Sequence, residues 1–383
     1  MSSEQPLLPV IQDEIRASGR ISFHRFMELC LYHPQNGYYS SETARLGKSG
    51  DFYTSAHAAP VFARILARHL ERSWRERGQP RSFELIELGP GDGQLPSELL
   101  PWIAQRFPEM FRSLRYTVVE RSASLRSRLE EVLKPHAARA SVVPDWEGVT
   151  NPSRDREGAV AAPTHKCVFA NEFFDALPVH LLVWRGGRWR ERYVFLEAGR
   201  LAWCEAEPAS PALAEEADSR FDPELPRSER KDGWIAEVSP QAAEWMARIG
   251  QFLIPAPLPG ELLLIDYGYT VEEWQQGRFP EGSALAYRRH QVVDDLLSHP
   301  GDQYLTAHVN FSQLIAAGKK AGMQVRRFES QARFLMGLGQ EDEFRDVFAD
   351  CGSEAERLRR SRLLKTLVLP QGMGEAFRVL VMG

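Results

Sequence analysis

Two short stretches of the chain carry residues whose types and spacing suit chemistry. The first is "ELGPGDG", residues 87–93, with Gly89, Gly91 and Gly93 at every second position. Glycines in a turn between a strand and a helix let the backbone approach a nucleotide-like ligand without a Cβ in the way. The dinucleotide fingerprint needs the spacing GxGxxG, but Gln94 stands where its last glycine would be. A tight turn without a ligand is the alternative interpretation.

Carboxylates accompany this turn. Glu87 lies two residues before Gly89, and Pro90 lies inside the turn. This E-x-G-x-G-x-G form resembles the first motif of S-adenosylmethionine-dependent methyltransferases. Their cofactor carries an ammonium and a sulfonium, so nearby acids favour its binding. Glu120 ends the next apolar run, "YTVVE", where we expect it to accept hydrogen bonds from two ribose hydroxyls. Glu120 could instead be an acid favoured by the dipole of the following helix.

A further candidate for the cofactor is "PDW", residues 144–146, which follows the apolar run "ASVV". Asp145 would accept a hydrogen bond from the adenine amino group, and Trp146 would pack against the adenine ring. The sequence alone does not decide between this assignment and a plain loop.

The second chemical stretch is "ANEFFDALPVH", residues 170–180. It places Asn171, Glu172 and Asp175 at the carboxyl end of a predicted strand, the edge where sheets of this kind bind ligands. Two carboxylates three residues apart can hold a cationic acceptor against a methyl donor, and a carboxylate can take the proton that the product releases. The alternative is that both acids cap the next helix.

The elements that must position these residues form a predicted α/β fold. The first 80 residues are helical, with Ser22 as an N-cap and Gly19 ending the first helix. From residue 83 onward, short apolar runs alternate with helical stretches, which is typical of a parallel sheet. The predicted strands are 83–88, 115–120, 140–143, 167–171, 261–267, 323–329 and 376–382. Residues 181–207 contain an Arg-Gly-Gly-Arg turn that predicts a hairpin, and the Pro- and acid-rich residues 208–233 predict a surface loop.

Composition limits the classes of function. The 383 residues are 43% hydrophobic with a formal charge of −5, which argues for a folded core and against nucleic acid as the main partner. The basic stretch "RLRRSRLLK", residues 357–365, is interpreted as the solvated face of a helix. The chain has no apolar run of membrane-spanning length, no signal peptide and no Cys pair. We therefore expect a cytoplasmic protein with free thiols and, because no histidine pair has metal-ligand spacing, no metal.

Several stretches together resemble the MidA-type methyltransferases, a family that includes a mitochondrial protein arginine methyltransferase assisting assembly of respiratory complex I. The matching stretches are "FMELCLYHPQNGYY", "GDFYTS", "ELGPGDG", "NEFFDALPVH", "EVSPQAAEW", "LLLIDYG" and "YRRHQV…LTAHVNF". The resemblance implies a Rossmann-like, seven-stranded class I core over 81–383, with a helical N-terminal region covering the site and an insertion at about 181–233. It implies S-adenosyl-L-methionine as cofactor and S-adenosyl-L-homocysteine as product. The implied cofactor residues are Glu87, Gly89, Gly91, Glu120, Asn171 and Glu172, together with Pro90 and Gly93 of the same turn and Thr54 in "GDFYTS".

The resemblance also assigns an acceptor side at about 270–315. Asp266 ends the fifth predicted strand at the same sheet edge, and His308 follows in "LTAHVNF". His308 could act as a base near neutral pH or be structural. The chain departs from the family at Ala56 and His57, where Pro-Glu is usual, and at Asn310, where Asp is usual. None of these departures touches the glycine turn, so we still expect cofactor binding, and they bear on the acceptor.

The predicted function is a methyltransferase acting on a protein arginine. A guanidinium stays charged at neutral pH, and an acidic pocket of Glu172, Asp175 and Asp266 suits it. The resemblance implies a respiratory-complex subunit as the protein acceptor. Two alternatives stay open: a methyltransferase for a small-molecule acceptor, and an assembly protein that binds the cofactor without turnover. The apolar inserted hairpin would suit a homodimer.

Overall fold

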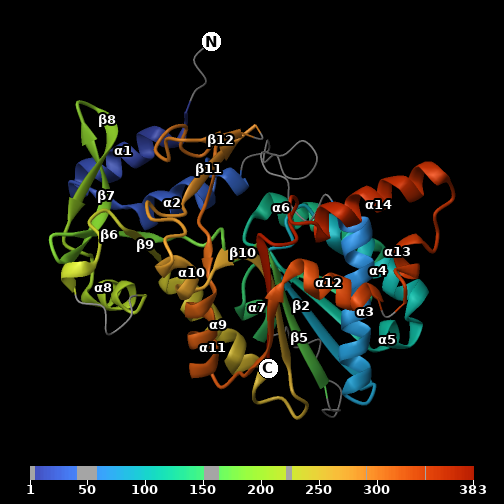
Figure 1. The fold of residues 1–383 in the computed structure, drawn as a ribbon. Helices are drawn as coiled ribbons and strands as arrows, with labels where there is room; N and C mark the ends of the chain where they lie inside the picture. Colours follow the sequence, from blue (N-terminus) through green and yellow to red (C-terminus); the bar gives the residue numbers. More distant parts are fainter. Residues whose placement is uncertain (1–4, 41–57, 151–163, 221–226, 290, 341) are drawn as a thin grey trace.

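A central mostly parallel sheet organises the chain in a computed structural model, which describes residues 5–40, 58–150, 164–220, 227–289, 291–340 and 342–383 (Figure 1). All seven predicted strands are present in it, in the order β15-β16-β10-β5-β2-β3-β4, and a short β14 adds to β10. The strands are β2 (Ser82–Leu88), β3 (Leu114–Val119), β4 (Ala140–Val143), β5 (Thr164–Asn171), β10 (Glu261–Tyr269), β14 (Val309–Asn310), β15 (Val325–Ser330) and β16 (Phe377–Met382). The prediction of a Rossmann-like methyltransferase fold is confirmed.

The direction of the strands decides where side chains can meet. β2, β3, β4, β5 and β10 run parallel, whereas β16 is antiparallel to both β10 and β15. The carboxyl ends of the five parallel strands therefore share one edge of the sheet. That edge receives the glycine turn after β2, Glu120 after β3, and the Asn171–Asp175 segment after β5.

Helices cover both faces of the sheet. They are α3 (Ala59–Glu76), α4 (Gln94–Arg106), α5 (Pro108–Ser113), α6 (Ala123–Leu133), α7 (Glu147–Thr150), α9 (Pro240–Leu253), α11 (Phe311–Lys320), α12 (Gln331–Gln340), α13 (Arg345–Phe348) and α14 (Glu354–Val368). The short α10 (Val271–Gln275) packs through Trp274 on residues of the insertion instead. Short 3₁₀ turns are η1 (Tyr38–Ser40), η4 (Lys134–His136) and η6 (Arg227–Glu229). The basic stretch 357–365 lies in α14, as predicted.

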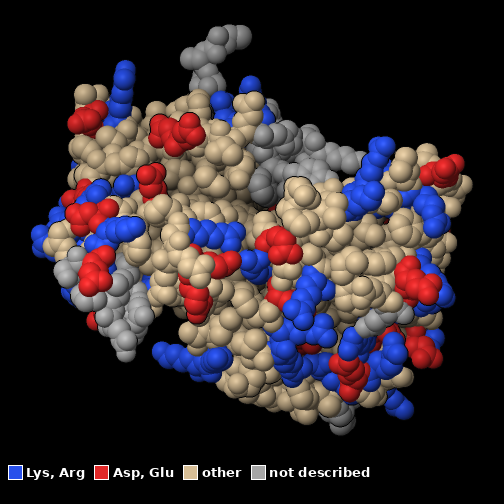
Figure 2. All heavy atoms as spheres, viewed as in Figure 1, with Lys and Arg blue, Asp and Glu red and all other residues tan. Residues whose placement is uncertain are grey.

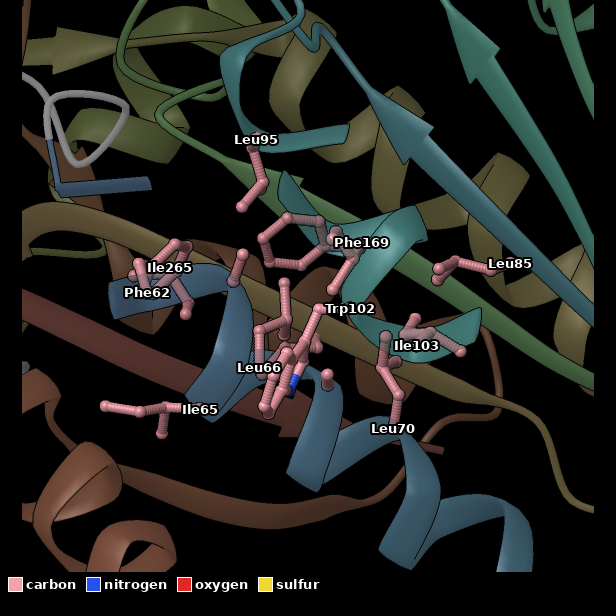
Figure 3. Packing of buried hydrophobic residues seen from close by; sticks show 14 of the residues in the cluster. Phe62, Ile65, Leu66, Leu70, Leu85, Leu95, Trp102, Ile103, Phe169 and Ile265 are labelled. Carbon is pink, nitrogen blue, oxygen red and sulfur yellow. The ribbon is translucent and has the colours of Figure 1, made fainter. Parts of the chain in front are cut away.

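The inner strands of the central sheet are buried on both faces by alternating side chains. Phe169 of β5 and Ile265 of β10 pack with Phe62 and Leu66 of α3 on one face (Figure 3). Their sequence neighbours on the strands, such as Ala170, pack on the opposite face with residues of α9 and α11. Burial on both faces explains why these strands are continuous apolar runs, since a strand with one wet face would alternate with polar residues.

A second sheet is built mostly from the insertion. It contains β1 (Ile21–Ser22), β6 (His180–Arg185), β7 (Arg188–Glu197), β8 (Arg200–Ala206) and β9 (Ile235–Val238). The hairpin predicted at the Arg-Gly-Gly-Arg turn joins β6 to β7. The prediction of a loop over 208–233 is wrong for α8 (Pro211–Asp218), a helix whose Leu213 and Ala217 pack against this sheet. Burial of those two residues outweighs the Pro-rich, acidic composition around them.

The N-terminal helices divide between the two sheets. α1 (Leu7–Ser18) and α2 (Phe23–Tyr32) pack with β6 and β7 of the insertion, whereas α3 packs on the central sheet. Ser22 caps α2 by accepting a hydrogen bond from the Arg25 amide, as predicted. A small third sheet, with β11 (Leu285–Arg288), β12 (Gln291–Val293) and β13 (Tyr304–Thr306), joins the cluster around α2.

Charged side chains of both signs are interspersed over the face shown in Figure 2. Within the described ranges, no helix combines the length and apolar character needed to cross a bilayer.

Candidate active site

The glycine turn joins β2 to α4 in a backbone conformation that L side chains rarely adopt. Gly89, Gly91 and Gly93 have φ of 62°, 60° and 83°. The Gly89 amide donates to the carbonyl of Val119 in β3, and the Gly93 amide donates to the carbonyl of Pro90, which is buried within the turn. Positive φ at three alternate positions explains the glycine spacing, because a Cβ would be strained at each of them.

The three glycines differ in what surrounds them. A Cβ on Gly89 would lie 2.9 Å from Cδ2 of Phe173, and one on Gly93 would lie 3.1 Å from Cδ2 of Leu129. Around Gly91, no heavy atom of the described residues lies within 4 Å of the Cβ position. Gly89 and Gly93 are therefore needed for packing inside the protein, while Gly91 leaves open space at the sheet edge, as a cofactor cradle requires.

Glu87 lies deep in β2, with 3% of its surface exposed. The hydroxyl of Tyr116 in β3 donates a hydrogen bond to its Oε2. Burial raises the pKa of Glu87 to about 8, because desolvation disfavours the charged form. At neutral pH this carboxyl is mostly protonated, so its role at the turn is a hydrogen-bonding one more than a charged one.

Glu120 follows β3 at the same edge and is also buried. Its Oε1 accepts a hydrogen bond of 2.7 Å from the amide of Ser122, the N-cap of α6. Burial raises its pKa to about 7, against the Ser122 hydrogen bond and the Arg126 charge, which lower it. Glu120 thus helps to start α6, and its assignment as the ribose ligand stays a prediction.

Asp145 and Trp146 are neighbours in the sequence but differ in their burial. Asp145 is exposed, and its Oδ1 accepts a hydrogen bond of 2.9 Å from the amide of Gly148. Trp146 is buried, with its ring edge-on to Trp245 and Phe252 at centroid distances of 5.7 and 5.4 Å. Their contact with adenine stays a prediction; what the structure shows for Trp146 is packing against α9.

The Asn171–Glu172 pair ends β5 beside the glycine turn. Glu172 has φ of 50°, in the left-handed region, and its amide donates to the carbonyl of Ile265 in β10. The Asn171 amide group donates to Glu172 Oε1 at 3.3 Å. A positive φ is unfavourable for a residue other than glycine, so the surrounding structure must hold Glu172 in this conformation. Residues of this kind are frequent at functional sites. Both residues keep their predicted place, next to Phe173 and Gly89.

Asp175 is an enclosed acid of the candidate site, with 1% of its surface exposed. Its Oδ2 accepts hydrogen bonds from the hydroxyls of Tyr267 and Tyr304, each at 2.8 Å, and of Thr306, at 3.0 Å. Its Oδ1 is buried and has no hydrogen-bond partner among the described residues. The turn 172–179 leads directly into β6 without a helix, so the alternative that Glu172 and Asp175 cap a helix is excluded.

Asp266, in β10, is fully buried, and its carboxyl oxygens accept hydrogen bonds from backbone amides. Its Oδ2 accepts hydrogen bonds from the amides of Phe174 and Asp175, and its Oδ1 accepts one from the amide of Tyr267. Burial raises the pKa of Asp266 well above its usual range, and the charges of Asp175 and Glu172 raise it further. Asp266 therefore holds the turn that carries Asp175, and three backbone donors occupy its oxygens.

His308 precedes β14 and faces aromatic rings. It lies edge-on to Tyr267, with centroids 4.9 Å apart, and 4.5 Å from the ring of Phe279. Its Nδ1 is 3.3 Å from the carbonyl of Ser283, which identifies Nδ1–H as the donor. Burial lowers the pKa of His308, so the ring is neutral near pH 7. A catalytic role as a base stays a prediction.

Three hydroxyl residues of the site were not among the predicted catalytic or cofactor residues: Tyr267, Tyr304 and Thr306. Tyr267 lies in the family-like stretch "LLLIDYG", Thr306 lies in "LTAHVNF", and Tyr304 directly precedes that second stretch. Asn310, a departure from the family, is the N-cap of α11 and accepts a hydrogen bond from the amide of Gln313, which an Asp would do equally well. Thr54, Ala56 and His57 lie outside the described residues.

Comparisons with known proteins agree on the family. Residues 65–329 match the model of a family described as "Putative S-adenosyl-L-methionine-dependent methyltransferase". Among curated proteins, the chain is 29% identical over 387 residues to the rat protein arginine methyltransferase NDUFAF7, mitochondrial, covering 97% of this chain and 83% of that protein. The human protein of the same name is 28% identical over 393 residues, covering 98% and 83%.

A solved structure agrees with these sequences. A COG1565 superfamily protein from Burkholderia thailandensis, bound to S-adenosyl-homocysteine, is 27% identical and superposes with a TM-score of 0.81, covering 99% of this chain and 92% of that one. S-adenosyl-L-methionine is thus the cofactor, as predicted. One prediction is wrong: the curated relatives, including the Drosophila melanogaster homologue, are named as mitochondrial, which contradicts a cytoplasmic location.

Proposed function

The chain belongs to this family of S-adenosyl-L-methionine-dependent methyltransferases, and from that premise we propose that its acceptor is an arginine side chain of a protein. The curated relatives, which match almost the whole chain, are named protein arginine methyltransferases. The observation that carries the proposal is the buried carboxylate of Asp175, with one oxygen held by three hydroxyls and the other without a described partner.

The glycine turn fits the cofactor. At Gly91 the cofactor would approach the backbone, because no heavy atom of the described residues lies within 4 Å of the Cβ position there, and Glu120, which follows β3, would accept hydrogen bonds from the ribose hydroxyls. Asn171 and Glu172, at the end of the neighbouring strand β5, would contact the cofactor on its acceptor side. The bound cofactor supplies a methyl group on a sulfonium.

The acceptor side supplies orientation and a proton acceptor. A guanidinium remains charged at neutral pH, and a carboxylate in a poorly solvated site binds it strongly. Asp175 Oδ1 would accept a hydrogen bond from one guanidinium nitrogen and fix its position in line with the methyl group. As the new N–C bond forms, the bond between the methyl group and sulfur would break and leave S-adenosyl-L-homocysteine. The nitrogen then loses a proton, which a carboxylate at this edge would take.

Methyl transfer from labelled S-adenosyl-L-methionine tests this proposal. The wild-type protein and Glu172→Gln are incubated with arginine-containing proteins, including respiratory-complex subunits, which the family resemblance names as acceptors. We expect label on arginine with the wild type and at least tenfold less with Glu172→Gln. An exposed acid in α14 provides the control, Glu354→Gln, which should match the wild type.

Two other outcomes contradict the proposal. Label on a small molecule with none on protein indicates a different acceptor class. No transfer by the wild type, together with tight binding of S-adenosyl-L-homocysteine, indicates a protein that binds the cofactor for assembly without turnover.

A further inference from the structure

The hydrogen bonds on Asp175 are distributed unevenly between its two oxygens. Tyr267, Tyr304 and Thr306, here called the hydroxyl cluster, all reach Oδ2, at 2.8, 2.8 and 3.0 Å. Oδ1 is equally buried and has no partner among the described residues. A carboxylate that only needed to be satisfied in the interior would share its donors between both oxygens, since both oxygens are acceptors and a buried acceptor without a partner is costly.

We propose that the hydroxyl cluster consists of positioning residues, which hold the Asp175 carboxylate by Oδ2 so that Oδ1 is left for the acceptor. This inference rests on the proposed function, because it takes the acceptor to be a cationic side chain. Tyr267 lies in β10, and Tyr304 and Thr306 lie in β13, so two elements distant in sequence from Asp175 fix one oxygen. Thr306 Oγ1 also lies 3.1 Å from the Asp175 carbonyl, which fixes the backbone of the same residue.

The cluster also keeps this carboxyl ionisable. Burial raises the pKa of Asp175, whereas the hydroxyls of Tyr304, Tyr267 and Thr306 lower it, because they stabilise the charged form. The other titratable groups that face it are Asp266 of β10, Tyr32 of α2 and Tyr39 of η1. Those groups oppose its ionisation or are neutral. The hydroxyl cluster therefore gives the largest effects that favour a charged Asp175, and the backbone amide of Ala176 adds a smaller one.

The cluster is connected to the cofactor edge through η1. Tyr39 lies edge-on to Tyr304, with ring centroids 6.2 Å apart. The backbone carbonyl of Tyr39 accepts a hydrogen bond of 2.8 Å from Ser122 Oγ, and the Ser122 amide donates to Glu120. These contacts connect Asp175, which would hold the acceptor, to Glu120, the predicted ribose ligand.

The test removes single hydroxyls while retaining the ring or the branched shape: Tyr304→Phe, Tyr267→Phe and Thr306→Val. Loss of a donor raises the pKa of Asp175, so the acidic limb of the pH profile of kcat/KM should move to higher pH. We expect at least a tenfold loss of kcat/KM near neutral pH, a smaller loss at alkaline pH, and S-adenosyl-L-homocysteine affinity within twofold of wild type. Thr306→Ser keeps the hydroxyl and should recover most of the activity.

The matched control removes a tyrosine–carboxylate hydrogen bond elsewhere. In the insertion, the Tyr193 hydroxyl donates to Glu191 Oε2 at 2.9 Å, so Tyr193→Phe loses the same kind of bond without touching Asp175. Its pH profile should match the wild type. Equal losses at every pH for all three cluster variants, or an unmoved profile in each, would overturn the inference.

A readout independent of the acceptor separates this inference from the proposed function. The ¹³C resonance of the Asp175 carboxyl, assigned by its absence in Asp175→Asn, is titrated in the wild type and in Tyr304→Phe. A higher pKa in Tyr304→Phe supports the cluster even if no arginine is methylated, and an unchanged pKa contradicts it. If the wild type methylates arginine and the hydroxyl-cluster variants do so equally well, the proposed function is supported and this inference is wrong.

Discussion

At the scale of single residues, the glycines of one turn have different tasks. Gly91 borders open space, whereas a Cβ on Gly89 would meet Phe173 at 2.9 Å. Both have positive φ, which costs an alanine about 1–2 kcal/mol at either position. We expect Gly91→Ala to weaken binding of S-adenosyl-L-homocysteine by roughly tenfold or more, about 1.4 kcal/mol. Gly89→Ala should lose more stability than Gly91→Ala.

Isothermal titration calorimetry and thermal melts of the two variants separate these effects. If Gly91→Ala binds the product as tightly as the wild type, the cofactor does not occupy the space at this glycine. The triple-glycine pattern was readable from the sequence, but the distinction between Gly89 and Gly91 was not, because Phe173 meets Gly89 only through the pairing of β2 with β5.

Glu120 gives a pH-dependent prediction at the same scale. Its pKa is raised from 4.5 to about 7 by burial, so the unfolded chain ionises first as pH increases. Its contribution to stability is therefore complete below pH 4.5 and is lost as pH rises to about 7. If Glu120 is the ribose ligand, as predicted, the ribose hydroxyls stabilise its ionised form, so product affinity should increase between about pH 6 and pH 8. The Glu120→Gln variant should bind weakly with a flat profile; an equally steep profile in it would assign the dependence to another group.

At the scale of elements, Asp266 ties the turn after β5 to β10. It accepts hydrogen bonds from three backbone amides, and each buried donor left without a partner costs about 1–3 kcal/mol. We expect Asp266→Ala to lower the free energy of unfolding by about 3 kcal/mol or more, measured by urea denaturation. Asp145→Ala, which removes one hydrogen bond at an exposed site, should lose about 1 kcal/mol or less. Equal losses of unfolding free energy in the two variants would show that Asp266 does not hold the turn after β5 to β10.

Elements of the central sheet could be predicted closely, because fully buried parallel strands are continuous apolar runs. β10, for example, is buried along its whole length and covers Glu261–Tyr269, against the predicted 261–267. The helix α8 could not be predicted, because its packing on the insertion sheet, and not its local sequence, stabilises it. The same limit applies to the acceptor side: Tyr304 meets Asp175 across 129 residues, and no local pattern records such a contact.

At the scale of the whole molecule, one apolar cluster joins the N-terminal helices, the insertion and β13. Phe26 of α2 is fully buried in it, together with Val194 of β7 and Leu305 of β13. Leu305 lies between Tyr304 and Thr306, so the cluster supports the residues that hold Asp175. Truncating a buried Phe typically costs about 3–5 kcal/mol.

We therefore expect Phe26→Ala to raise KM for the acceptor more than it changes affinity for the cofactor. The cofactor edge belongs to the central sheet, which is packed by separate clusters. Steady-state kinetics with each substrate varied in turn gives the comparison, with thermal melts to confirm that the variant is folded. Equal effects on both substrates would indicate that the two sides of the molecule are not separable.

The most direct test of the central claim is tandem mass spectrometry of an arginine-containing protein substrate after reaction with methyl-deuterated cofactor. The account predicts the label on an arginine nitrogen with the wild type, and its loss in Asp175→Asn while that variant still binds S-adenosyl-L-homocysteine. Label on any other kind of residue, or a wild-type rate in Asp175→Asn, would contradict it.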